Sequence, residues 1–291
     1  MKIYNESDLL NQEYRMALIE EIEGPENIQR KKESFKRWEI YRDRIKKYIL
    51  ESLLMELDPD TVQEMNQIIS SINVYKKIVS KKGRVYKDTP QRKALEPSGQ
   101  ADVQNFVDSM ADWLSLNSTM KKANKYVEAF RNTLVYVKPF IDQEKFKKFN
   151  IALEVLAPHR FDAIEDSQNH EQLRAVILSD FNYTGSISDS STQNRSFGGL
   201  KNNFRDGDGI NQIIADSPSD QNKKQYIFWS ASYHFTCNDK AEIISMNDLG
   251  DEKIKNPINE LPFVSFAKDQ DGSFWSVGGE DMIDGSILIN K

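Results

Sequence analysis

The chain has 291 residues, of which 29% are charged and 38% are hydrophobic, and it carries a formal net charge of -6. That length fits one large domain or two ordinary ones. No segment approaches the roughly 20 apolar residues that a membrane-spanning helix needs, and the first residues lack the apolar core of a secretion signal. A single cysteine, Cys237, excludes an internal disulfide framework and favours a reducing compartment. We therefore expect a soluble intracellular protein.

The charge is distributed unevenly along the chain. Residues 1–160 have a net charge of +4, whereas residues 161–291 have a net charge of -10. One interpretation is that the front of the chain meets nucleic acid while the back repels it. The alternative is ordinary variation of surface charge, because net charge bears on association more than on fold.

Apolar side chains recur at intervals of three and four over the first 130 residues, which predicts packed helices. Asp58 and Pro59 give a helix start signal, and a helix is predicted from there to Gly83, which can end it. A polar spacer with two prolines follows, and two further helices are then predicted. The apolar positions of the four helices are Trp38, Tyr41, Ile45 and Tyr48; Met65, Ile68, Ile72, Tyr75 and Val79; Val103, Phe106, Met110 and Trp113; and Met120, Ala123, Val127 and Phe130.

A dense basic run lies at the end of the second helix and continues into the spacer. It holds eight basic residues against one acid, Asp88, and its members are Lys76, Lys77, Lys81, Lys82, Arg84, Lys87, Arg92 and Lys93. Such a run can bind phosphates without reading a base sequence. It can equally face acidic patches on a neighbouring subunit, or simply keep a loop solvated. These readings stay open at the level of the sequence.

Beyond Asn132 the hydrophobic period changes to two, which predicts strands. The clearest is Tyr226–Cys237, expected as one long strand. A polar stretch at about 183–224 is expected to be a long loop or insertion that interrupts a sheet. Helices followed by strands indicate an α+β fold rather than alternating βαβ units. The other predicted strands are centred on 135–137, 149–155, 175–178, 242–246, 262–267 and 273–277.

Motifs for catalysis or metal binding are weak in this sequence. The run Asp269–Ser273 with Glu280 imitates a calcium loop, but Phe274 occupies the position that needs glycine. The aspartate–glycine step at 271–272 instead predicts a hairpin turn. The histidines and Cys237 share no metal-ligand spacing, and no phosphate-binding loop or nucleophile elbow is present. We therefore expect no enzymatic activity, no cofactor and no metal.

Four segments, taken in order, resemble the portal protein of tailed bacteriophages, the head-to-tail connector. The first resembles a signature helix followed by a turn, and the second a strand-and-turn element that precedes another strand. The third resembles a long aromatic strand, and the fourth resembles an "NPiGelPfv" element in which Asn259 replaces the usual glycine. They are Ile68–Val79 running into Arg84–Pro90, Leu156–Asp166 followed by Arg174–Leu178, Tyr226–Phe235, and Asn256–Val264.

The resemblance implies a structural virion protein, assembled in the host cytoplasm, that forms a homo-oligomeric ring, typically a dodecamer, at one capsid vertex. Such rings pass double-stranded DNA non-specifically during packaging and ejection. They also dock the terminase motor, capsid proteins and the tail or adaptor, and they need no membrane. On this reading the chain corresponds to the wing of the portal.

The same resemblance divides the chain into three parts. Residues 1–131 would be the helical part of the wing and residues 132–278 its β-rich part. Residues 279–291 would begin a helix leading to a stem that is absent here. The rival hypothesis is a stand-alone nucleic-acid-binding adaptor that uses the basic run at 76–93.

Overall fold

The computed structural model describes most of the chain in ten stretches. The described residues are 2–3, 5–84, 101–142, 148–166, 168–169, 172–179, 224–246, 254–268, 274–275 and 280–290. The predicted insertion at 183–224, apart from Lys224, lies outside them, as does the predicted hairpin turn at 271–272. In the predicted strand at 273–277, only Phe274 and Trp275 are described, and both are in bends.

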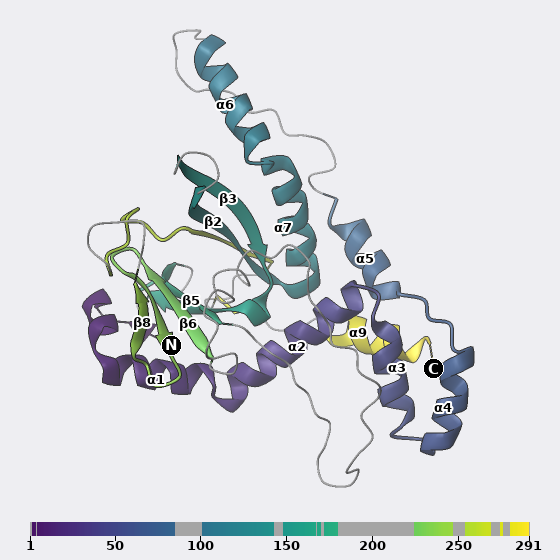
Figure 1. Ribbon diagram of the computed structural model, residues 1–291. Coiled ribbons are helices and arrows are strands. Elements are labelled where there is room, and N and C mark those ends of the chain that lie inside the picture. The colour runs from purple at the N-terminus through teal and green to yellow at the C-terminus, as the bar shows by residue number, and fades with distance from the viewer. Residues whose placement is uncertain are drawn as a thin grey trace.

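Helices dominate the first 130 residues, as the apolar spacing predicts (Figure 1). Asp58 caps one of them by accepting from the Thr61 amide at 2.9 Å, in agreement with the predicted start signal. The helices are α1 (Gln12–Ile22), α2 (Pro25–Tyr41), α3 (Ile45–Leu53), α4 (Pro59–Ile68), α5 (Val74–Lys82), α6 (Ala101–Trp113), α7 (Leu116–Phe130) and α9 (Glu280–Leu288), with 3-10 turns η1 (Glu6–Leu10) and η2 (Pro158–Arg160).

The single helix predicted from Asp58 to Gly83 is wrong, because the chain forms α4 and α5 with a break at 69–73. The break contains two serines and an asparagine, whose side chains compete with the helical backbone for hydrogen bonds. Asn73 does so directly, since its side-chain oxygen accepts from the Lys76 amide at 2.8 Å and caps α5. The predicted helix face through Tyr41 and Ile45 is also interrupted, because Asp43, between α2 and α3, has a φ of 67°, which lies outside the helical range.

The strands form two sheets that are almost wholly antiparallel. A six-stranded sheet has the order β1-β4-β5-β6-β7-β8, in which only the β1–β4 pair is parallel, and a three-stranded sheet has the order β3-β2-β9. Their bounds are β1 (Lys2–Ile3), β2 (Asn132–Asp142), β3 (Lys148–Leu156), β4 (Phe161–Asp166), β5 (Leu173–Ser179), β6 (Gln225–Ser230), β7 (His234–Asn238), β8 (Ile243–Met246) and β9 (Phe263–Ala267).

The predicted long strand Tyr226–Cys237 is wrong in one respect, because it folds back on itself as the β6–β7 hairpin. Ser230 makes the turn, since its hydroxyl accepts from the Tyr233 amide at 2.9 Å and its own amide donates to the Tyr233 carbonyl at 2.8 Å. Alternation within β6 still holds. Phe228 packs toward α1, whereas Trp229 packs toward the three-stranded sheet.

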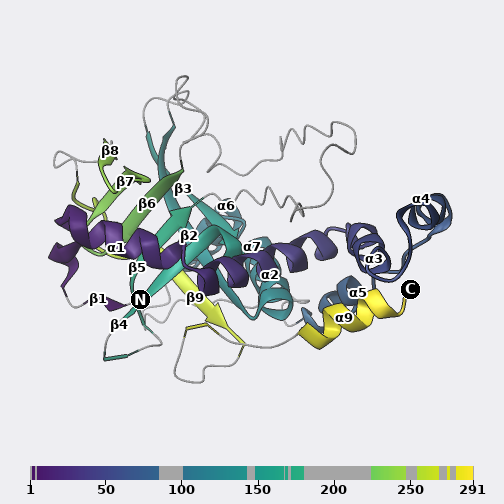
Figure 2. The ribbon, with the colours of Figure 1, turned by 90° about the horizontal axis from the view of Figure 1, so that it is seen from below.

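The two sheets and two helices form a layered body. Helix α1 covers one face of the six-stranded sheet, and the other face packs on the three-stranded sheet through Tyr136, Phe161 and Trp229. Helix α7 then covers the far face of the three-stranded sheet through Ala123. Figure 2 shows α2 running from this body to a separate group of helices, α3, α4, α5 and α9.

These helices share a second core with α2 and α7, built around Ile40, Ile49, Tyr75, Phe130 and Ile283. Mostly N-terminal helices followed by antiparallel sheets confirm the predicted α+β class. Among the described helices, none has the length and hydropathy that a membrane span requires.

Candidate functional site

The basic run divides between α5 and residues that the structure does not describe. Lys76, Lys77, Lys81 and Lys82 belong to α5, and Arg84 follows it, whereas residues 87, 92 and 93 lie outside the described residues. Lys76 forms an ion pair with Asp43. That pair occupies one cation of the run, so the available basic charge lies further along α5.

Helix α5 separates buried and charged side chains onto different faces. Tyr75 and Val79 are buried in the helical core, while Lys77 and Lys81, four residues apart, are exposed. Lys81 and Lys82 lie in the last turn, next to the partial negative charge of the helix end. Those two lysines therefore also stabilise the helix that carries them.

Gly83 brings a further lysine to this basic end. A Cβ at Gly83 would lie 2.8 Å from Lys125 Cγ and 3.1 Å from Lys125 Cα, so α5 ends directly against α7. Lys125 was missed by the sequence reasoning, which considered only the apolar face of α7. The lysines on the opposite face of that predicted helix are the signal that could have found it.

We call Lys77, Lys81, Lys82, Arg84 and Lys125 the basic surface. Within the described part of the chain, none of these five side chains forms an ion pair. The surface therefore presents cations to solvent, where they can attract phosphates or acidic protein groups.

A charge cluster joins α2 to β4, and its carboxylate is closed to solvent. Asp162 is fully buried and pairs with Arg30 at 2.5 Å and with Lys31 at 2.6 Å. The Arg30 guanidinium also lies 3.7 Å from the centre of the Trp275 ring. Burial lowers the pKa of Lys31, and the Asp162 charge opposes that shift. The cluster holds two elements together rather than binding a ligand.

His159 sits beside this cluster in an aromatic enclosure. Phe35 and Trp38 lie 5.5 and 5.7 Å from its ring, and Ser34 Oγ is 3.2 Å from Nδ1. Burial lowers the pKa of His159 to about 3, with a smaller effect of Arg160 in the same direction. The imidazole is therefore neutral at neutral pH and packed away from any solvent-borne substrate.

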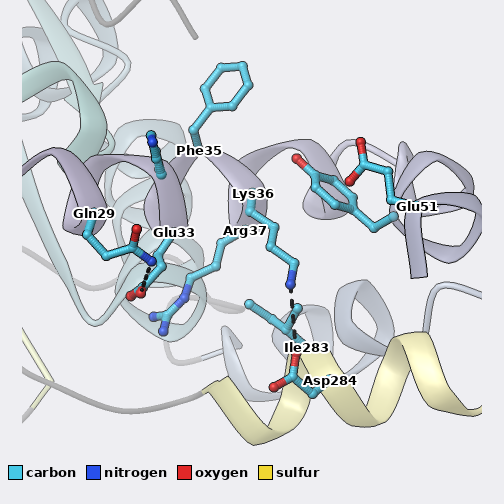
Figure 3. Close-up of a pocket in the computed structure, with 10 residues that line it drawn as sticks. Gln29, Glu33, Phe35, Lys36, Arg37, Glu51, Ile283 and Asp284 are labelled. Atoms are coloured by element: carbon cyan, nitrogen blue, oxygen red, sulfur yellow. Dashed lines mark hydrogen bonds and ion pairs between the residues drawn. The ribbon is translucent and has the colours of Figure 1, made fainter. Parts of the chain in front are cut away.

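A cleft of about 420 Å³ lies between α2, α3 and α9 (Figure 3). Its charges are mixed: Lys36 reaches toward Asp284 at 3.7 Å, and Gln29 donates to Glu33 at 2.9 Å. Burial is the main cause that raises the pKa of Glu51. The described residues lining the cleft include no histidine, cysteine or serine. Among the described residues, the cleft therefore has no serine–histidine or cysteine–histidine pair.

Metal and thiol chemistry have no visible centre in the described residues. No three histidine, cysteine, aspartate or glutamate side chains there are grouped so as to hold a metal ion. Cys237 is buried in the core between α1 and the six-stranded sheet. Burial raises the pKa of its thiol to about 11, which leaves it protonated and unreactive at neutral pH.

No protein-family model matches the sequence, and no curated protein matches it either.

Proposed function

We propose that this chain is a structural virion protein that resembles a bacteriophage portal and assembles with its own copies into a ring. The proposal rests on the positions, in the fold, of the four segments that resemble the portal protein. Residues 85–90 of the first segment lie outside the described residues. The described parts of the segments cover the α4–α5 connection and most of α5, the passage from β3 through η2 into β4, most of β5, the β6–β7 hairpin, and the entry into β9. These are framework positions, as expected for a resemblance based on architecture rather than on catalytic residues.

Two of these segments contact each other through a buried asparagine. Asn256, which is 1% exposed, donates from its side chain to the carbonyls of Ser230 and Glu260, at 2.7 and 2.8 Å. Its own backbone amide donates to the Ser232 carbonyl at 2.9 Å. The element that resembles "NPiGelPfv" is thus held against the hairpin turn of the aromatic strands. These hydrogen bonds make the two segments parts of one structural unit.

A second link runs from the strand-and-turn segment to the helices. Arg30 of α2 donates to the Pro158 carbonyl at 3.1 Å, and His159 packs against Phe35 and Trp38 of the same helix. On the proposal, this framework gives each subunit a fixed shape in a ring at the capsid vertex. The ring would pass double-stranded DNA without base contacts and would dock terminase and the tail or adaptor proteins.

The experiment that tests this proposal is native mass spectrometry of the purified chain, combined with negative-stain electron microscopy. The expected result is a discrete homo-oligomer, with about the dodecameric mass that the resemblance implies, seen as rings with a central opening. A chain that stays monomeric at every concentration tested would contradict the proposal.

A stand-alone nucleic-acid-binding adaptor is the second candidate, and the unpaired cations of the basic surface favour it. Such a protein would bind duplex DNA as a monomer with affinity that falls steeply with salt. Lys81→Ala, Lys82→Ala and Arg84→Ala together should then remove about three units from the slope of log affinity against log salt, since each phosphate contact contributes nearly one. Unchanged DNA binding by this triple variant would exclude the adaptor.

A further inference from the structure

The end of α3, the following turn and α4 form an acidic tip, defined as residues 54–68. Between Lys47 and Lys76 the sequence has no basic residue and five acids. Four of these acids lie in the tip, and all four are exposed: Glu56, Asp58, Asp60 and Glu64. The tip therefore presents concentrated negative charge at the end of the helical group farthest from the sheets (Figure 2).

The tip also exposes large apolar side chains. Met55 and Ile68 are 87% and 82% exposed, and Leu54 and Leu57 are exposed as well. Single exposed apolar residues are ordinary, whereas here four large ones lie within fifteen residues of one helical hairpin. Asp60, Glu64 and Ile68 recur every four residues, so α4 turns one acidic and apolar face outward.

Further exposed apolar side chains lie on the α4–α5 connection and at the end of α9. Asn290 fixes Ile72 beside α9, because its side chain accepts from the Ile72 amide at 2.6 Å and donates to the Ile72 carbonyl at 3.0 Å. Ile72, Leu288 and Ile289 are all more than half exposed. The outward face is thus broader than α4 alone.

The basic surface is opposite in charge to the acidic tip, and it lies at the C-terminal end of α5. Helix α5 begins six residues after α4 ends, and the basic surface gathers around its last turn and Lys125 of α7. Nine helical residues advance about 12 Å, so the two surfaces are separated along the molecule (Figure 1). Among the described residues, no ion pair joins the acidic tip to the basic surface.

We infer that the acidic tip of one copy docks on the basic surface of a second copy. Charge complementarity identifies the occupant, since the chain itself carries both halves of the contact. Two different surfaces make the contact heterologous, and repeating it closes a ring or extends a filament. This inference deepens the proposed function and rests on it for the existence of an assembly. It adds to that proposal the two surfaces through which neighbouring subunits would contact each other.

Two charge-reversal variants of the whole chain test the contact. The tip-reversed variant carries Glu56→Lys, Asp60→Lys and Glu64→Lys, which leaves the tip with a net positive charge. The surface-reversed variant carries Lys77→Glu, Lys81→Glu and Lys82→Glu, which leaves the basic surface with a net negative charge. Each alone should weaken self-association by roughly a hundredfold or more, since opposed like charges cost several kcal/mol and each 1.4 kcal/mol is tenfold. Circular dichroism confirms that each variant is folded, and native mass spectrometry gives the subunit number.

Mixing the two variants provides the decisive measurement. In the mixture, the basic tip of one variant meets the acidic surface of the other, and the two native surfaces also still meet. The expected products are assemblies with equal numbers of both variants. The chain with all six substitutions should assemble by itself. Matched controls reverse exposed charges elsewhere, Glu20→Lys with Asp239→Lys and Lys32→Glu with Lys240→Glu, and should assemble normally.

The outcomes separate this inference from the proposed function. If the unmodified chain forms rings and both reversed variants form them equally well, the contact is overturned while the ring proposal stands. Dissociation of both variants without recovery on mixing would also overturn the contact, because complementarity requires the rescue. A monomeric unmodified chain would overturn both proposals.

Discussion

Asp162 holds its negative charge where water is excluded, and two cations surround it. Because Lys31 is 1% exposed, its ammonium stays buried when the carboxylate is lost, while Arg30 is partly exposed and lies over the Trp275 ring. Breaking a buried pair is therefore far more costly than breaking a surface pair. The cluster therefore makes the junction between α2 and β4 sensitive to a single isosteric change at Asp162.

The variant Asp162→Asn should lower the free energy of unfolding by about 3–5 kcal/mol, since it leaves an uncompensated buried charge. Urea denaturation followed by circular dichroism measures the loss. The matched control is Asp284→Asn, whose carboxylate is 3.7 Å from Lys36 and largely exposed. The control should change stability by less than about 1 kcal/mol. Equal effects of the two substitutions would contradict the buried-cluster interpretation.

The low pKa of His159 predicts that the free energy of unfolding decreases as the pH falls. Its folded pKa of about 3 lies below the ordinary 6.5, so the unfolded state binds the extra proton first. The contribution of neutral His159 is complete above pH 6.5 and is lost as the pH falls from 6.5 toward 3. The loss approaches about 1.4 kcal/mol per pH unit within that window.

Urea denaturation at several pH values between 7.5 and 4.5 checks this expectation by comparing the native chain with His159→Gln. The variant should be less stable at pH 7.5, because it loses the aromatic packing, but its stability should fall less steeply with acid. Parallel pH profiles would show that His159 is not the titrating group. His234→Gln provides the comparison with a histidine outside the aromatic enclosure.

At the scale of elements, local signals predicted more than long-range ones. The cap at Asp58 and the apolar spacing of α5 and α7 depend on residues close in sequence, and these predictions are confirmed. The break at 69–73 was missed because apolar spacing continues through it, while Asn73 stops the helix by capping the next one. The β6–β7 turn was missed because Ser230 and Tyr233 make it without glycine or proline.

At the candidate site, too, local sequence signals were predictive and long-range contacts were not. A basic run can be read directly from the sequence, so Lys77, Lys81 and Lys82 were predicted. Lys125 was not predicted, because α5 and α7 meet through a tertiary contact at Gly83. Likewise, no local pattern shows that Lys76 is already paired with Asp43, a residue 33 positions away. A surface composed from two helices cannot be completed from the periodicity of either helix alone.

The contact at Gly83 predicts opposite effects for two glycine-to-alanine substitutions. Gly83→Ala should lower the free energy of unfolding by roughly 1–3 kcal/mol, as overpacking does, because the new methyl group meets the Lys125 backbone and the Val79 carbonyl. Gly285→Ala, within α9, has no atom within 4 Å of the new Cβ. It should raise stability by about 0.5–1 kcal/mol through helix propensity. Thermal denaturation of both variants measures the difference, and a stabilising Gly83→Ala would refute the close approach.

At the scale of the whole molecule, α2 connects the two cores. Arg30 and Lys31 near its start pair with Asp162 of the six-stranded sheet, while Ile40 near its end is fully buried in the helical core. Helix α7 makes a second connection, through Ala123 to the three-stranded sheet and through Phe130 to the helical core. Neither core can lose its packing without exposing apolar surface of a helix that the other core also uses.

We therefore predict a single cooperative unfolding transition rather than separate melting of the helices and the sheets. Replacing Trp38 and Trp113 with phenylalanine leaves Trp229 and Trp275 as fluorescence probes of the core between the sheets, and far-UV circular dichroism follows the helices. The urea midpoints from the two signals should coincide, and Asp162→Asn should shift both by the same amount. Helices that melt at lower urea than the tryptophan signal changes would instead mean that the chain divides into two independently stable units, with α2 as no more than a linker between them.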